Sequence, residues 1–460
     1  MQVTVVGGGA SGTLAALHLI RQATAARIQL TLDIIEPGPL GHGVAYSTSN
    51  HAHRLNVPAA GLSALPDEPD HLVRWLRDHH DPDFPAGGFA PRALFGRYLA
   101  HTLDQQLRAA PGLTWTQHRT RAVGVRRHGA GAAVTLANGH DLTADAVVLA
   151  LGHGAATVNW VPAPLARSPR FVADPWAPGA LPELPAGSVV LLVGTGLTMV
   201  DVALGYERCQ LHTVSRHGLL PLAHVPDPPA PDPAASPDPA TPLTAAAVRQ
   251  LVFGRIRALD GDWRTAVDGL RPVTQLLWSR LADTERRRLL AQGQRRWERA
   301  RHRMAPELGA WLADRHTRGR LTVRPASVTS ARPDGARLTV GFSDGTSLRA
   351  DLVINCTGRA AAPEPADDPL VCSLLTPGPV RPGSAHCGPL ARPGPLGLGF
   401  ATYPDGRLAA PADLPAWTLG SLRRGQLWES TAIPEIRDQA ATLATAILSR
   451  AQAQPRREVA

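Results

Sequence analysis

The sequence predicts an α/β protein with two Rossmann-like dinucleotide-binding domains, each built in three layers, and a helical insertion. The first observation is that apolar runs meet glycines twice, in "VTVVGGGASG" at residues 3–12 and in "VVLLVGTGL" at residues 189–197. The second is that each run is followed by apolar residues at helical spacing and then by another strand. The third is an arginine-rich region, residues 243–318, whose apolar residues are spaced for a helix packed on one side.

The first glycine turn fits G-x-G-x-x-G and predicts a dinucleotide site. The first glycine permits a tight turn, the second lets the backbone approach a pyrophosphate, and the third lets the helix pack on the strand. The helix then presents free N–H groups to the phosphates. Glu36 ends the next strand, 24 residues after Gly12, where a carboxylate accepts hydrogen bonds from ribose hydroxyls. The predicted binding residues are Gly7, Gly9, Ala10, Ser11, Gly12 and Glu36; the alternative is a glycine-rich turn in an unrelated α/β protein.

The second glycine turn has the first two glycines of the motif but Met199 in place of the third. Its next strand ends in Ser215-Arg216 rather than in an acid. An acid would repel a 2′-phosphate, whereas an arginine pairs with one, so the turn favours NADP and leaves NAD as the second choice. A solvated surface arginine, in a half that binds no nucleotide, is the alternative. The residues predicted to bind NADP are Gly194, Thr195, Gly196, Leu197, Ser215 and Arg216.

Two further strands end in short glycine turns, "LALGH" at residues 149–153 and "INCTGR" at residues 354–359. In a protein with two dinucleotide domains, strands of this type end where the chain crosses between the domains. The expected division is residues 1–155 as the first part of one dinucleotide-binding domain, 156–350 as an NAD(P)-binding domain with a proline-rich linker at 225–242 and the helical insertion at 243–318, 351–450 as the second part of the first domain, and 451–460 as a flexible tail.

Composition excludes several classes of protein. The formal charge is +9, but the chain contains no lysine and all 47 basic residues are arginine, which points to a codon bias rather than to a basic face for nucleic acid. Without lysine, Schiff-base and Walker-type phosphate chemistry is ruled out. The four cysteines form no close pair, so neither a metal site nor a dithiol centre is expected. No apolar run is long enough for a membrane span and no signal peptide is evident, so we expect a cytoplasmic protein.

Six longer motifs carry a resemblance to a known family: "GHGVAYST" (41–48), "HRLNVPA" (53–59), "PDEPDHLVRWL" (66–76), "GTGLTMVD" (194–201), "SRHGLLPLAH" (215–224) and "LRRGQLWESTAIPEIRDQA" (422–440). Through them the chain resembles the two-dinucleotide-binding-domain flavoproteins, and more narrowly the FAD/NAD(P)-binding family that includes FAD-dependent urate hydroxylase and aspartate N-monooxygenase. The resemblance implies FAD in the domain formed by residues 1–155 and 351–450, together with NAD(P)H, a small-molecule substrate and oxygen insertion. It does not imply urate or aspartate.

The resemblance also places residues around the flavin. Pro37 and Gly43 belong to a segment that would leave the ribose and run along the cofactor, and Gly152 ends the crossing strand. Gly420-Ser421 stands where many such flavoproteins have Gly-Asp, so the usual acid at the ribityl chain is replaced by a serine. Asn56 is implied to lie near the flavin ring, where an amide hydrogen-bonds N5 or an oxygen adduct, and is the one candidate catalytic residue. A turn-forming role is the alternative for Asn56.

Three functions are compatible with these observations. The first is an FAD-dependent NAD(P)H oxidoreductase of monooxygenase type, which hydroxylates a small molecule through a C4a-(hydro)peroxyflavin. The second is an NAD(P)H-dependent flavoprotein reductase that passes electrons to an electron-carrier protein or a quinone, docked by the arginine-rich helices. The third is a non-catalytic nucleotide sensor or scaffold. In the first, the insertion at 243–318 is the expected wall of a substrate pocket.

Overall fold

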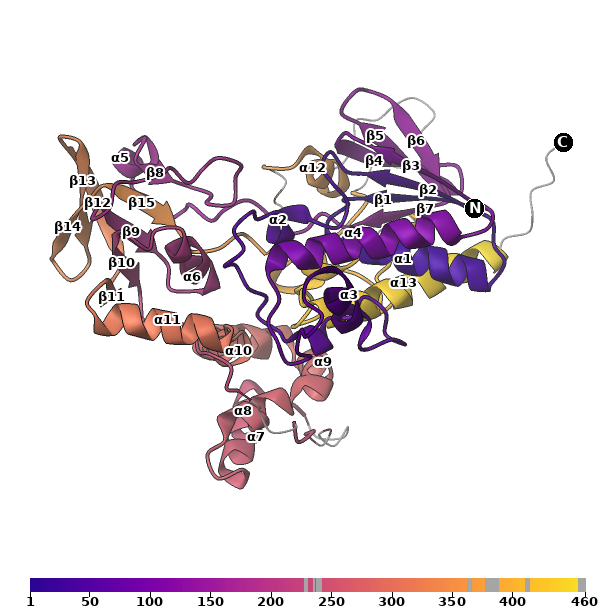
Figure 1. The fold of residues 1–460 in the computed structure, drawn as a ribbon. Coiled ribbons are helices and arrows are strands. Elements are labelled where there is room, and N and C mark those ends of the chain that lie inside the picture. Colours follow the sequence, from indigo (N-terminus) through magenta and orange to yellow (C-terminus); the bar gives the residue numbers. More distant parts are fainter. Residues whose placement is uncertain are drawn as a thin grey trace.

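Two parallel sheets of five strands each stand side by side, with a group of helices below them in the view of Figure 1. The computed structural model describes residues 1–226, 231–234, 236, 242–361, 364, 366–376, 389–409 and 414–453. The predicted fold class is confirmed, because the chain forms two Rossmann-like parallel sheets, and it also forms two small antiparallel sheets and a helical insertion. Among the described helices, none has the length and apolar character needed to cross a lipid bilayer.

The first parallel sheet has the strand order β16-β7-β1-β2-β3. Its strands are β1 (Gln2–Val6), β2 (Leu30–Ile35), β3 (Leu113–His118), β7 (Ala146–Leu149) and β16 (Ala416–Thr418). One face is covered by α1 (Ala10–Ala25), α4 (Arg92–Ala109) and α13 (Ile433–Ala453), and the other by α12 (Pro369–Leu375) with the antiparallel sheet β4 (Ala122–His128), β5 (Gly131–Leu136) and β6 (Asp141–Ala144). Alternate strand residues, such as Val5 and Val6, therefore enter separate cores on the two faces.

The second parallel sheet has the order β11-β10-β9-β15-β8 and repeats this layered plan. Its strands are β8 (Phe171–Val172), β9 (Val189–Val193), β10 (Gln210–Ser215), β11 (Leu321–Pro325) and β15 (Leu352–Asn355). The helices α6 (Leu197–Leu204) and α11 (Pro306–Thr317) cover one face, and α5 (Ala163–Ala166) with the sheet β12 (Val328–Asp334), β13 (Arg337–Phe342) and β14 (Ser347–Ala350) covers the other.

The chain crosses between the sheets twice, after β7 and after β15. The two crossing segments pair with each other through an antiparallel bridge between Ala156 and Arg359, and the Ala360 N–H donates to the Ala155 carbonyl at 2.8 Å. Because β15 hydrogen-bonds to β9, the expected division after residue 350 falls one strand too early. The chain leaves the second sheet only after Asn355, since "LVIN" is a buried strand of that sheet rather than the start of the return.

Of the expected insertion at 243–318, four helices form the helical insertion: α7 (Ala245–Ala258), α8 (Trp263–Asp268), α9 (Arg271–Arg280) and α10 (Asp283–Arg301). The last part of that range, α11, packs on the second sheet instead. The insertion docks on the C-terminal segment: the Trp278 ring stacks on Trp428 with centroids 4.8 Å apart, and the Trp278 indole N–H donates to the Gly425 carbonyl at 3.0 Å. Of the expected linker at 225–242, residues 227–230, 235 and 237–241 lie outside the described residues. So do 454–460 of the expected tail, whose first three positions continue α13.

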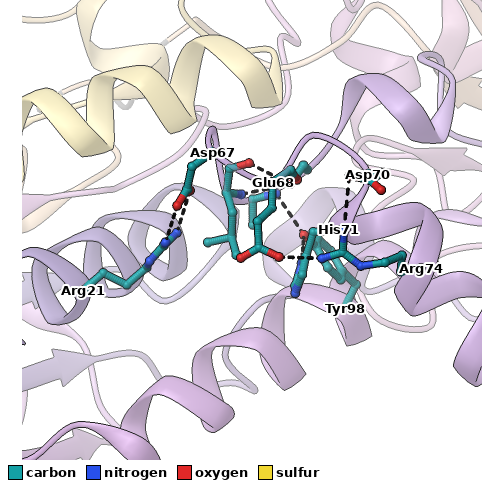
Figure 2. Close-up of polar contacts among 10 residues, drawn as sticks. Arg21, Asp67, Glu68, Asp70, His71, Arg74 and Tyr98 are labelled. Carbon is teal, nitrogen blue, oxygen red and sulfur yellow. Dashed lines mark hydrogen bonds and ion pairs between the residues drawn. The ribbon is translucent and has the colours of Figure 1, made fainter.

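The motif at residues 66–76 fixes a loop rather than a site. It leads into α3 (His71–His79), and the segment before it contains α2 (Gly43–Tyr46) and the short helix η1 (Ala59–Gly61). Figure 2 shows Arg21 of α1 pointing at Asp67, with the closer N···O contact at 2.7 Å, and Arg74 lying between Glu68 and Asp70. His71 Nδ1 meets the hydroxyl of Tyr98 on α4 at 2.8 Å. These contacts attach the loop to three helices.

Candidate functional site

The first glycine turn, between β1 and α1, is shaped so that only glycine fits at two of its positions. Gly7 has φ +98°, and a Cβ there would lie 2.3 Å from the Ala150 carbonyl oxygen. A Cβ on Gly12 would lie 1.7 Å from the Gly7 oxygen, so this glycine allows α1 to pack against the strand end. Gly9 caps α1 without a side-chain acceptor, which leaves the N–H groups at Ala10, Ser11 and beyond free to receive an anion.

Glu36 follows β2 and holds the loop that faces this turn. Its Oε2 accepts from the Gly8 N–H of the glycine turn at 2.8 Å, and its Oε1 accepts from the Gly38 N–H, just past Pro37, at 2.9 Å. Further along, Gly43 approaches so closely that a Cβ on it would lie 3.1 Å from the Gly9 Cα. Each carboxylate oxygen keeps a second acceptor position for a ribose hydroxyl.

The C-terminal part of the chain also reaches the first glycine turn, and we call the meeting point of these segments the mouth of the first domain. A Cβ on Gly420, in the short helix η3 (Gly420–Arg423), would lie 3.1 Å from Ser11 Oγ. Ser421 Oγ donates to the Gly152 carbonyl oxygen just past β7. The structure thus brings Ser11, Gly152, Gly420 and Ser421 together from three distant segments. Ser421 ties two strand ends together and carries no charge toward the mouth.

Asn56 lies on a segment that contacts α6 and the chain after β10. Its backbone carbonyl accepts from His224 Nε2 at 3.0 Å. His53 Nε2 meets the Asp201 carbonyl at 3.0 Å, and burial lowers the pKa of His53 to about 4, so this ring is neutral at neutral pH. Arg92 pairs with the Asp201 carboxylate at 2.7 Å, and burial nevertheless raises the pKa of Asp201 to about 6. This contact between α4 and α6 was not evident from the sequence.

The second glycine turn has the same geometry at its first two glycines. Gly194 has φ +116°, and a Cβ there would lie 2.4 Å from the Cys356 carbonyl oxygen. Gly196 caps α6 in an extended conformation, and a Cβ on it would have no atom within 4 Å. Leu197 begins α6, and Thr195 Oγ1 lies 2.8 Å from Ser215 Oγ.

The second turn differs from the first in sequence at Met199 and at Arg216, and the structure places Met199 in the core and Arg216 at the surface. Met199, in place of the third glycine, is fully buried in the core beneath the second sheet. Arg216 is exposed and makes no hydrogen bond or ion pair within the described part of the chain.

A cavity of about 560 Å³ lies between α10 and the C-terminal segment. Its wall includes Leu290, Gln294 and Arg287 of α10, which face Leu398, Arg424 and Trp428. Arg424 is anchored by Glu298 at 3.2 Å, and Gln294 donates to the same carboxylate at 2.8 Å. The cavity therefore combines an apolar wall with guanidinium groups. It also reaches Ala361, beside the crossing that starts after β15.

Two histidines close to Arg424 have lowered pKa values. Burial, together with the positive charge of Arg301, lowers the pKa of His302 to about 4. Burial, together with the positive charges of Arg424 and Arg359, lowers the pKa of His153. Both residues are nevertheless exposed to solvent in part. Within the described residues no three His, Cys, Asp or Glu side chains are grouped to hold a metal ion.

Glu429 forms a buried ion pair with Arg301 of α10, with Nε and Oε1 3.0 Å apart and side chains that are only 8% and 12% exposed. The pair joins the helical insertion to the segment that leads into α13. Glu429 is therefore engaged in a structural contact.

The two sheets, each with an open glycine turn, define the fold of the two-dinucleotide-binding-domain flavoproteins. A family model described as FAD-NAD(P)-binding matches residues 4–154. No curated protein sequence matches the chain.

Many solved structures match the chain, and three that match nearly its full length serve as examples. Ornithine hydroxylase from Pseudomonas aeruginosa is 16% identical, with a TM-score of 0.63 over 98% of this chain and 99% of that one. The FAD-bound cadaverine monooxygenase from Erwinia amylovora is 12% identical, with 0.61 over 100% and 96%. L-Lysine 6-monooxygenase from Pseudomonas syringae is 15% identical, with 0.60 over 97% and 99%. At these identities the likeness establishes the shared fold.

Proposed function

We propose that the protein is an FAD-dependent NAD(P)H oxidoreductase of monooxygenase type that hydroxylates a small molecule. The observation that carries this proposal is the pair of glycine turns, each with a helix N-terminus free of any side-chain cap. The family model that matches residues 4–154 supports FAD at the first turn. The narrower resemblance to urate hydroxylase and aspartate N-monooxygenase supports oxygen insertion.

At the first turn, the residues fit the adenosine and pyrophosphate parts of FAD. Gly9 and Gly43 let the turn and the facing loop approach each other closely, and the free N–H groups of α1 suit phosphate oxygens. Glu36 would hold the ribose. Bound FAD would supply the redox chemistry and the reaction with oxygen, while the chain positions the partners and excludes water. We assign residues 1–155 together with the segment after Asn355 to this FAD-binding domain.

At the second turn, the residues fit a nicotinamide nucleotide. Open space at Gly196 admits a pyrophosphate, and the exposed, unpaired Arg216 would pair with a 2′-phosphate, which favours NADP over NAD. The cavity beside α10 would take the substrate. Its guanidinium groups and its leucine and tryptophan wall suit a small molecule with both an apolar part and a polar or anionic group.

Anaerobic reduction followed by an oxygen pulse tests the proposal. Purified protein loaded with FAD should be yellow, and NADPH should bleach it without oxygen. Oxygen should then yield hydroxylated product when a substrate is present. Amines, purines and aspartate are the first compounds to screen, because the matched structures and the resembled family name them. Protein that takes up no FAD would refute the proposal, and peroxide without any product would favour the reductase function.

A further inference from the structure

Arg295, on α10 of the helical insertion, reaches over the second glycine turn. Its Nη2 lies 3.2 Å from the Thr195 carbonyl oxygen, 3.3 Å from Thr195 Oγ1 and 3.2 Å from the Leu219 carbonyl oxygen. Thr195 stands between the two glycines of that turn, so a guanidinium from a distant part of the chain lies at the N-terminal end of α6. Nothing in the glycine motif itself indicates this residue.

The guanidinium has no counter-ion and has donors to spare. Nη2 carries two hydrogens and faces three neutral oxygens, so these hydrogen bonds cannot all be made at full strength. Within the described residues, Arg295 has no carboxylate partner, and its Nη1 and Nε have no acceptor. A half-buried cation in that condition gains most from an anion, because hydrogen bonds between charged partners are about twice as strong as neutral ones.

We propose that Arg295 binds the pyrophosphate of the nicotinamide nucleotide, an inference that rests on the proposed function. The phosphates would lie between the free N–H groups of α6 and this guanidinium, over the open space at Gly196. Arg295 would therefore serve the part of the ligand that NADH and NADPH share. Arg216, at the end of β10, would serve the 2′-phosphate that only NADPH carries.

Affinity for the two nucleotides distinguishes these roles. In the FAD-loaded full chain, the concentration dependence of anaerobic flavin reduction gives Kd for NADPH and for NADH. We expect R295Q to raise both values, by roughly 10- to 100-fold, as for the loss of a hydrogen bond to a charged group. R295K should recover part of the loss, because it keeps the charge but not the planar fork. R216Q should raise Kd for NADPH alone.

Arg299 provides the matched control, since it lies one turn further along α10 and its Nε donates to the Leu220 carbonyl at 2.6 Å. R299Q removes a similar attachment of the same loop without touching the glycine turn, so both Kd values should stay unchanged. The FAD content of each variant verifies its folding. R295Q with wild-type Kd values, or with a loss confined to NADPH, would overturn the assignment. Wild-type protein that is reduced by neither nucleotide would refute the proposed function as well.

Discussion

Substitution of Gly196 by alanine should separate folding from nucleotide binding. The residue has φ −91° and ψ −169°, a conformation that alanine adopts freely, and its Cβ would meet no atom within 4 Å. At such a position the change from glycine to alanine stabilises a protein by about 0.4–1 kcal/mol, because the unfolded chain loses freedom. G196A should therefore melt at or slightly above the wild-type temperature.

The added methyl group would nevertheless occupy the space that a pyrophosphate needs in order to approach the backbone. We expect the loss of about two charge-assisted hydrogen bonds from backbone N–H groups, or at least ~3 kcal/mol. That loss corresponds to an increase of roughly 100-fold in Kd for NADPH. The same titration of flavin reduction measures it, alongside a melting curve and the FAD content, which should be normal.

Gly254 of α7 is the control, because a Cβ there also meets no atom within 4 Å, and α7 contributes no residue to either glycine turn. G254A should gain stability and keep the wild-type Kd. A stable G196A with wild-type affinity for NADPH would refute the reasoning, since the nucleotide could not then lie over this turn. Gly12 shows the contrast: there the clash at 1.7 Å with the Gly7 oxygen should prevent the first domain from folding around an alanine.

Two further predictions concern ion pairs. Burial raises the pKa of Asp201 from 3.8 to about 6, so the stabilising contribution of the protonated carboxyl is complete below pH 3.8 and is lost as the pH rises through 6. The stability of wild type relative to D201N should therefore fall by roughly 3 kcal/mol across that window, and a constant difference in thermal stability would contradict this. E429Q leaves Arg301, only 12% exposed, without its counter-charge. The free energy of unfolding measured in urea should therefore fall by about 3 kcal/mol, and hydrogen exchange in α10 should become faster. Unchanged exchange in α10 would show that the pair does not hold the insertion.

Sequence reasoning reached the features that local pattern determines. Both glycine turns and the placement of Glu36 follow from the spacing of residues within one strand–helix–strand unit, and the structure has these units in that form. The family resemblance added Gly420-Ser421 as part of the flavin site, which no local pattern contains. The strand Leu352–Asn355 belongs to the second sheet, whereas its apolar run alone is compatible with either sheet.

Contacts between residues that lie far apart in the sequence could not be predicted from the sequence. Arg295 and Thr195 are 100 positions apart, and Ser421 and Gly152 are 269 apart. The pairing of Arg92 with Asp201 requires α4 of one unit to meet α6 of the other. In a chain whose 47 basic residues are all arginine, no composition signal marks these few as special. Arg92 and Arg295 are brought to their partners only by the packing of the two sheets and the insertion.

The nested order of the strands has a consequence for synthesis on the ribosome. The edge of β7 has no partner until β16 emerges about 270 residues later, a delay of roughly 15–50 s at ordinary elongation rates. During this interval the strands of the second sheet have already left the exit tunnel. α1 meanwhile lacks α13, which later covers it. The nascent chain should therefore complete its middle before its beginning, and the mouth formed by Ser11, Gly152 and Ser421 should be the last part to assemble.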